Sequence, residues 1–179
     1  DRQIFKDRGL SVVACPASNA KLASGIVPAH EYLEEGISLG LGTDGPASNN
    51  GLDMFREMYL CAVLPKLLTG DASCMDAKEV LKAASTGGAR AMGLIDSDVL
   101  AVGKKADFIL IDMTRPNMQP IHQIEKNLVY SGSKENVLLT AVDGRILYEK
   151  GEFYTGDKPE EIYSRTKQIC DRIKQQLNE

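Results

Sequence analysis

Histidine is nearly absent from this sequence, whose 179 residues contain only His30 and His122. The two lie far apart, so this chain alone cannot complete a histidine-rich metal centre. The four cysteines form no Cys-x-x-Cys pair, and we interpret them as reduced, mostly buried side chains. No apolar run approaches the roughly 18–20 residues that span a bilayer. The first residues lack the apolar core of a signal peptide, which predicts a cytoplasmic protein without a membrane partner.

The sequence also lacks an excess of positive charge. Its 21 basic and 25 acidic residues give a formal net charge of -4. Nucleic acid is therefore not an expected partner, because such binding needs a basic surface. Hydrophobic residues make up 43% and charged residues 26% of the chain, as is typical of a folded globular domain.

Strands and helices are predicted to alternate in the first half of the chain. Short apolar runs at 10–15 and 37–42 indicate buried strands, and the segments 16–25 and 43–51 are predicted loops. Helical patterns occupy the remaining segments, at 1–8, 29–35, 52–68, 76–84 and 87–92. This order is typical of βα units on a parallel sheet.

The second half has the pattern of a small antiparallel β unit followed by a helix. Asp143-Gly144 between two apolar runs is a strong hairpin signal. From Pro159 onward, apolar side chains recur on one helical face. The strands are expected at 106–112, 128–130, 137–142, 145–148 and 153–154.

The segment Gly42-Thr43-Asp44-Gly45 is the sharpest local feature. It places a carboxylate at the end of a predicted strand, where barrels of parallel strands build their active sites. Asp44 is suited to binding a metal or taking a proton from a water. Alternatively, Asp44 only stabilises the turn, since Asp-Gly after a strand is common.

Several motifs in this order resemble those of the amidohydrolase superfamily, with 5-methylthioadenosine/S-adenosylhomocysteine deaminases and chlorohydrolases as the most similar branch. The motifs are Cys15-Pro16-Ala17-Ser18-Asn19, Lys21-Leu22-Ala23-Ser24-Gly25, Leu41-Gly42-Thr43-Asp44-Gly45, Ser48-Asn49-Asn50, Leu52-Asp53-Met54, Gly103-Lys104-Lys105-Ala106-Asp107 and Val142-Asp143-Gly144-Arg145. Each motif alone is weak, whereas the ordered set is specific.

The resemblance implies a metal-dependent (β/α)8 barrel with a small β-sandwich. It implies hydrolytic deamination of an adenosine-type nucleoside, in which water attacks the purine ring. Asp44 would bind the metal, accept a proton and contact substrate. The cofactor would be one divalent metal, zinc or alternatively iron, whose other ligands lie outside this chain. Asn19 and Ser48 are candidate substrate contacts, although hydrogen bonding within their own loops is the simpler interpretation.

We therefore expect an α/β chain that carries the last two βα units of such a barrel (1–92), part of the sandwich (93–156) and a terminal helix (157–179). His30 and His122 match no ligand position of the family. Asp98 replaces a family glycine and is expected to affect only a turn. The expected partners are a nucleoside or other heterocyclic substrate and further copies of the protein. Two alternatives remain: another enzyme of the superfamily (chlorohydrolase, guanine or cytosine deaminase), or a non-catalytic truncated module or partner subunit that lacks the metal site.

Overall fold

A computed structural model describes residues 1–177 as two compact units. Unit 1 contains Asp1–Lys105 and Asp112–Asn136, and unit 2 contains Ala106–Ile111 and residues 137–177. The predicted division at 92 and 156 stays a prediction. In the part of the chain that the structure describes, no helix is long and apolar enough to cross a membrane.

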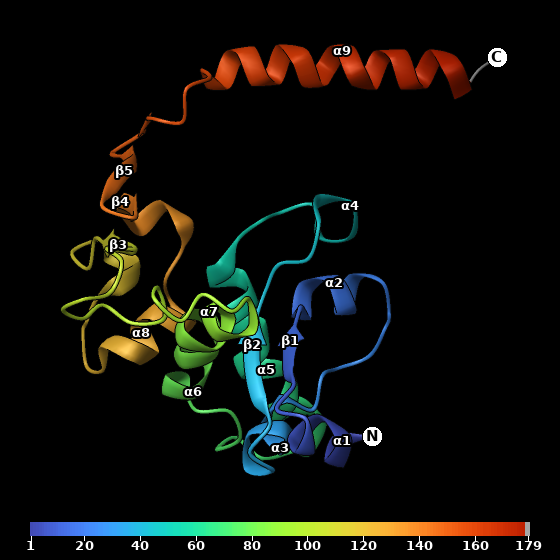
Figure 1. Cartoon of the computed structure of the whole chain (residues 1–179), viewed down its shortest axis with the longest axis vertical. Helices are drawn as coiled ribbons and strands as arrows, with labels where there is room; N and C mark the ends of the chain where they lie inside the picture. Colours follow the sequence, from blue (N-terminus) through green and yellow to red (C-terminus); the bar gives the residue numbers. More distant parts are fainter. Residues whose placement is uncertain (178–179) are drawn as a thin grey trace. The chain divides into compact units, whose positions relative to one another are not determined.

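Unit 1 is built on two parallel strands, β1 (Ser11–Ala14) and β2 (Ser38–Leu41), which pair in register from Ser11 opposite Ser38. Figure 1 shows the two strands side by side, with α2 and α4 beyond their carboxyl ends. The helices of this unit are α1 (Arg2–Asp7), α2 (Pro16–Lys21), α3 (Ala29–Glu34), α4 (Pro46–Asn49), α5 (Met54–Thr69), α6 (Ala77–Lys82), a π-helix at Ala83–Gly87, α7 (Gly88–Ala91), 3-10 turns at Pro116–Met118 and Lys134–Asn136, and α8 (Ile124–Tyr130).

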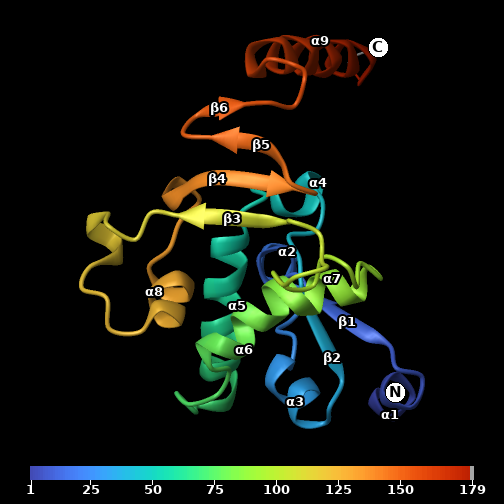
Figure 2. The same cartoon turned by 60° about the vertical axis from the view of Figure 1, so that its left-hand side comes forward.

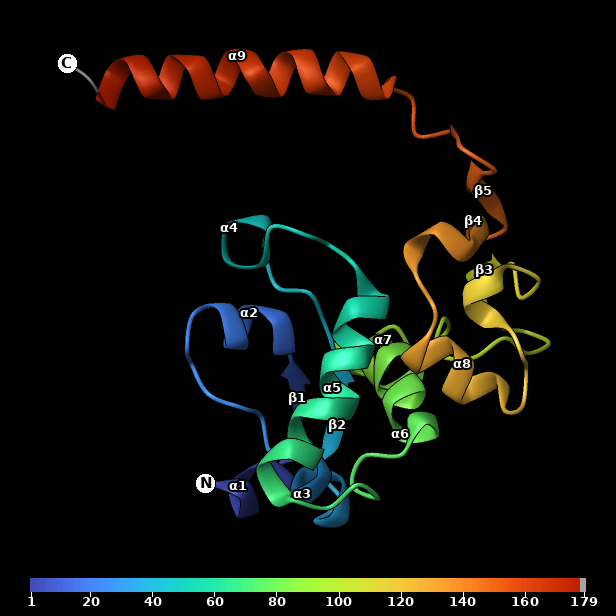
Figure 3. The ribbon, with the colours of Figure 1, turned by 180° about the vertical axis from the view of Figure 1, so that it is seen from behind.

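The helix α5 organises the core of unit 1, packing against α2, α3, α6 and α8. Figure 3 shows it between α2 on one side and α6 and α8 on the other. Its N-terminus is capped by Asp53, whose carboxylate accepts from the Phe55 and Arg56 amides. The buried apolar side chains around it include Phe55, Met58, Cys61, Ala62, Met75, Val80, Met118 and Val129.

Close backbone contact, expected from the glycines of the second strand, fixes β2 against the helical layer: a Cβ atom on Gly40 would lie 3.3 Å from the Gly88 Cα. A Cβ atom on Gly87 would lie 2.0 Å from the carbonyl oxygen of Leu39 in β2. Only glycine fits there without displacing the backbone.

Unit 2 contains a four-stranded antiparallel sheet in the order β3 (Phe108–Ile111), β4 (Val137–Val142), β5 (Arg145–Glu149) and β6 (Glu152–Phe153), shown in Figure 2. The predicted hairpin is confirmed: Asp143 and Gly144 have φ values of 51° and 75°, as a type I′ turn requires. The terminal helix α9 (Pro159–Leu177) also forms, and none of its residues is buried.

Three sequence predictions of secondary structure and one of burial are wrong. Residues 128–130 belong to the helix α8, where Val129 is buried against α5 and α6, rather than to a strand. The predicted loops after β1 and β2 each contain a short helix, α2 and α4, because Pro16 and Pro46 occupy the first helical turn, where a missing N–H costs nothing. The strand β1 is only partly buried: Val13 is 49% exposed, since β2 is its single strand neighbour among residues 1–177.

Asp98 does more than occupy a turn. Its side chain is buried and forms ion pairs with Lys104 (2.7 Å) and Arg90 (3.1 Å). These two cations lower the pKa of the Asp98 carboxyl, the Lys104 hydrogen bond contributing most. Asp98 is thus the centre of an ion-pair cluster that joins the end of α7 to the following loop.

Candidate active site

Asp44 lies just past the carboxyl end of β2, as predicted from the sequence, and its side chain is exposed. Its backbone adopts φ 59°, a conformation that aspartate tolerates better than most residues. This conformation lets the Gly45 amide donate to Asp44 Oδ1 over 2.7 Å. From the first turn of α2, the Ser18 hydroxyl donates to Asp44 Oδ2 over 2.8 Å. Residues from two neighbouring βα connections therefore meet at this carboxylate.

The electrostatics of Asp44 favour the charged form. The Ser18 hydroxyl, followed by the Ser48 hydroxyl and the Gly45 amide, holds the pKa of the Asp44 carboxyl below its ordinary value. An ionised carboxylate offers about four lone-pair positions, and the hydrogen bonds from Gly45 (2.7 Å) and Ser18 (2.8 Å), one on each oxygen, leave room for a further ligand. Asp44 therefore fits the role of one oxygen ligand to a divalent cation.

The two candidate substrate residues differ in their surroundings. The Ser48 hydroxyl lies in α4 and donates to the Gly45 carbonyl over 3.0 Å, a bond within its own loop. Asn19 lies in α2, where its backbone carbonyl accepts from Ser24. Its half-exposed side chain makes no hydrogen bond among residues 1–177. Asn19 is consequently the freer of the two to contact a ligand.

Neither histidine approaches this site. His30 is at the start of α3, and its Nε2 faces Glu34 at 3.2 Å. His122 is an exposed residue of unit 1, before α8. Within residues 1–177, no three side chains of His, Cys, Asp or Glu are grouped so that they could hold a metal ion.

Cys15, at the end of β1, is also a poor nucleophile. Burial raises the pKa of its thiol, and the Asp44 charge adds to the effect.

Sequence reasoning missed the carboxylate that lies beneath Asp44. Glu57, in the first turn of α5, is completely buried and accepts hydrogen bonds from the Ala17 amide (2.9 Å) and from Asn49 Nδ2 (2.7 Å). One signal for it was present: Glu57, Cys61 and Pro65 recur at i, i+4 and i+8, and all three are buried.

Comparison with known proteins decides the family. The sequence model described as "Amidohydrolase family" matches residues 1–147. The chain belongs to the amidohydrolase family. It therefore has the α/β fold of that family, and the resemblance inferred from the motifs is confirmed.

Individual members of the amidohydrolase family are clearly similar to this chain. A 5-methylthioadenosine/S-adenosylhomocysteine deaminase from Dictyoglomus thermophilum is 42% identical over 96% of this chain and 40% of its own length. The crystal structure of an adenosine deaminase from Xanthomonas campestris with bound zinc superposes with a TM-score of 0.92 at 38% identity, over 97% of this chain and 40% of that one. A mutant of atrazine chlorohydrolase from Arthrobacter aurescens, complexed with zinc and atraton, gives 0.84 at 28% identity, over 94% and 37%. The chain thus spans about two fifths of the length of these amidohydrolases.

Proposed function

We propose that this chain is part of a metal-dependent hydrolase that deaminates adenosine-type nucleosides such as 5-methylthioadenosine and S-adenosylhomocysteine. The observation that carries the proposal is the ionised carboxylate of Asp44, exposed at the carboxyl end of a parallel strand. Active sites of parallel barrels are built at this end. The names of the similar relatives supply the substrate class.

The architecture proposed for the whole enzyme is a (β/α)8 barrel. In it, β1 and β2 with their helices form the last two βα units, and the antiparallel sheet of unit 2 forms part of a small sandwich. The substrate is a small molecule, and further copies of the protein are the proposed macromolecular partners.

Asp44 is the proposed ligand of one divalent metal, zinc or alternatively iron, with the other ligands outside this chain. When bound, the metal would supply an activated water for attack on the purine ring. Asp44 would take a proton on a carboxylate oxygen, while the Ser18 and Gly45 hydrogen bonds hold that carboxylate in place. Asn19 and Ser48, on the same edge, would contact the substrate.

Two alternatives rest on separate observations. Similarity to an atrazine chlorohydrolase favours displacement of chloride from a triazine as a second candidate reaction. Guanine or cytosine deamination belongs to the same class of alternative. The lack of a complete metal-ligand group among residues 1–177 favours a non-catalytic module.

The test measures ammonia release from 5-methylthioadenosine and S-adenosylhomocysteine by the full-length protein, before and after removal of metal with a chelator. We expect release that is lost with the metal and restored by added zinc. Chloride release from atrazine without nucleoside deamination would favour the second candidate. A protein that holds no metal and turns over neither substrate would contradict both enzymatic proposals.

A further inference from the structure

We propose that Glu57 is a positioning residue that fixes the backbone on both sides of Asp44 and thereby sets where the metal-binding carboxylate lies. The inference rests on the proposed function for its link to the metal. Its structural part concerns only contacts among Ala17, Ser18, Thr43, Asn49 and Glu57, all within unit 1.

The burial of Glu57 needs an explanation. The side chain is 0% exposed, and no salt bridge to it occurs among the described residues. Removing a carboxylate from water costs several kcal/mol unless hydrogen bonds replace the water. Each Glu57 oxygen accepts one N–H, and the position in the first turn of α5 places the charge near the positive end of that helix. The free-energy cost of burying the Glu57 carboxylate is thus offset by oriented N–H groups rather than by a cation.

The hydrogen bond from the Ala17 amide connects Glu57 to the residues on one side of Asp44. Glu57 Oε2 accepts from the amide of Ala17 in the first turn of α2. The next residue, Ser18, is 2% exposed, and its hydroxyl donates to Asp44 Oδ2. Glu57 therefore fixes the first turn of α2, and Ser18 in that turn fixes the Asp44 carboxylate.

The hydrogen bond from Asn49 Nδ2 connects Glu57 to the backbone on the other side of Asp44. Asn49 Nδ2 donates to Glu57 Oε1 and also to the carbonyl oxygen of Thr43, over 2.6 Å. Thr43 directly precedes Asp44. A single amide group therefore links the buried carboxylate to the backbone that leads out of β2, and Arg56 contacts the Asn49 oxygen from α5.

The variant Glu57→Gln tests this arrangement. The Ala17 amide and Asn49 Nδ2 both donate to Glu57. The glutamine side chain has only one oxygen acceptor, so one of these two donors would face its NH2 group instead. Asp98→Asn is the matched control: it makes the same change at a second buried carboxylate with two nitrogen partners, which contacts neither Asp44 nor the residues beside it. If Glu57→Gln does not fold, Asn49→Ala replaces it, because that change breaks the Thr43 branch and the Arg56 contact but keeps the bond from Ala17 to Glu57.

Three quantities are measured on the full-length protein: zinc affinity, kcat and KM for 5-methylthioadenosine, and backbone amide hydrogen exchange. For Glu57→Gln we expect zinc affinity to fall about 10–100-fold, as for other residues that orient a metal ligand. We expect kcat to fall at least about 10-fold with a smaller change in KM, and exchange to rise in residues 16–22 and 43–50. Asp98→Asn should keep zinc affinity and kcat within about threefold and raise exchange only around residue 98.

Wild-type-like zinc affinity, kcat and exchange in folded Glu57→Gln or Asn49→Ala would overturn the inference. Equal losses of zinc affinity and kcat in Asp98→Asn would also overturn it, because they would indicate general destabilisation. If the wild-type protein neither binds zinc nor deaminates, the proposed function fails, and exchange in residues 43–50 of Glu57→Gln alone decides the structural part: unchanged exchange refutes it, and faster exchange supports it.

Discussion

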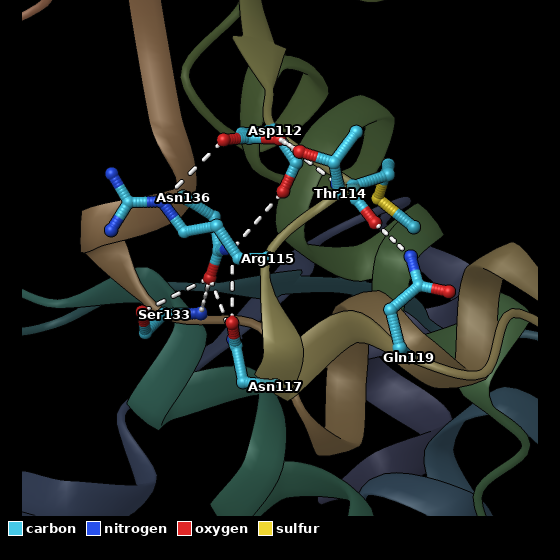
Figure 4. Close-up of polar contacts among 8 residues, drawn as sticks. Asp112, Thr114, Arg115, Asn117, Gln119, Ser133 and Asn136 are labelled. Carbon is cyan, nitrogen blue, oxygen red and sulfur yellow. Dashed lines mark hydrogen bonds and ion pairs between the residues drawn. The ribbon is translucent and has the colours of Figure 1, made fainter.

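The loop that carries Asp44 and the segment that ends at Asn136 are both polar clusters of unit 1, yet they differ in how fully their hydrogen-bonding capacity is used. Asn136 is 0% exposed, and its Oδ1 accepts from the Ser133 amide, the Ser133 hydroxyl and Asn117, over 2.9–3.1 Å. Its Nδ2 donates to the Asp112 carbonyl and to Asn117. Figure 4 shows these contacts converging on Asn136.

Asp44, by contrast, is exposed, and each of its carboxylate oxygens accepts one hydrogen bond, from Ser18 or from the Gly45 amide. A closed cluster such as that of Asn136 has no capacity left for a ligand, so its role is to stabilise the fold. An ionised carboxylate that is held from two sides and open to solvent on another can bind one. The contrast predicts that changes at Asn136 reduce stability, whereas changes at Asp44 reduce activity.

The largest effect is expected from Asp44→Asn in the full-length enzyme. In the proposed mechanism Asp44 binds the metal and accepts the proton, so loss of its negative charge should lower kcat about 10³-fold or more. The unfolding midpoint should change little. Asp53→Asn is the control, because asparagine caps a helix as well as aspartate does and should keep near wild-type kcat. Steady-state kinetics with thermal unfolding tests both, and normal turnover by Asp44→Asn would refute the assigned role.

The reverse pattern is expected from Asn136→Ala. The change leaves the Ser133 amide and the Asp112 carbonyl without their partner, which should lower the free energy of unfolding by about 2–4 kcal/mol. Asn117→Ala removes fewer of these bonds and should cost about 1 kcal/mol. Urea denaturation measures both, and kcat of the folded variants should match the wild type. A large drop in kcat without loss of stability would break the proposed contrast.

The smallest effect concerns the third polar cluster, at Asp98, whose charge is balanced by Lys104 and Arg90. Because the folded-state pKa of Asp98 is lowered, its ionised form stabilises the fold. This contribution is complete above about pH 4, the ordinary value in the unfolded chain, and is lost as pH falls through the lower folded-state value. The stability gap between wild type and Asp98→Asn in urea should therefore shrink below about pH 4. A gap that stays constant or widens toward pH 2 would contradict the ion-pair account.

Local sequence signals were sufficient for the elements with unambiguous chemistry. The strand ahead of Asp44, the helix that starts after Asp76 and the Asp143-Gly144 turn all form where their residues predict. The strand prediction for residues 128–130 failed because a short apolar, β-branched run fits either a strand or one buried helix turn. Only the packing of α8 against α5 and α6 decides between them.

The exposed residue of the site, Asp44, was predictable from the sequence, whereas the buried residues that hold it in place were not. Asp44 follows from its place after a strand and from the motifs around it. Ser18 lies 26 residues before its partner Asp44, and Glu57 lies 40 residues after its partner Ala17. Each pair comes within hydrogen-bond distance only after folding. The spacing of Glu57 with Cys61 and Pro65 indicates a shared face of α5, but no periodic signal in a single sequence reveals the long-range partners.

The central claim, that Asp44 is the metal-binding carboxylate of a hydrolase, is tested most directly by a crystal structure of the zinc-loaded full-length protein. Anomalous scattering at the zinc edge would locate the ion independently of the protein coordinates. We expect a carboxylate oxygen of Asp44 about 2.0–2.2 Å from zinc, with the Ser18 hydroxyl still donating to that side chain. A zinc ion bound elsewhere, with Asp44 contacting only Ser18 and Gly45, would contradict the account.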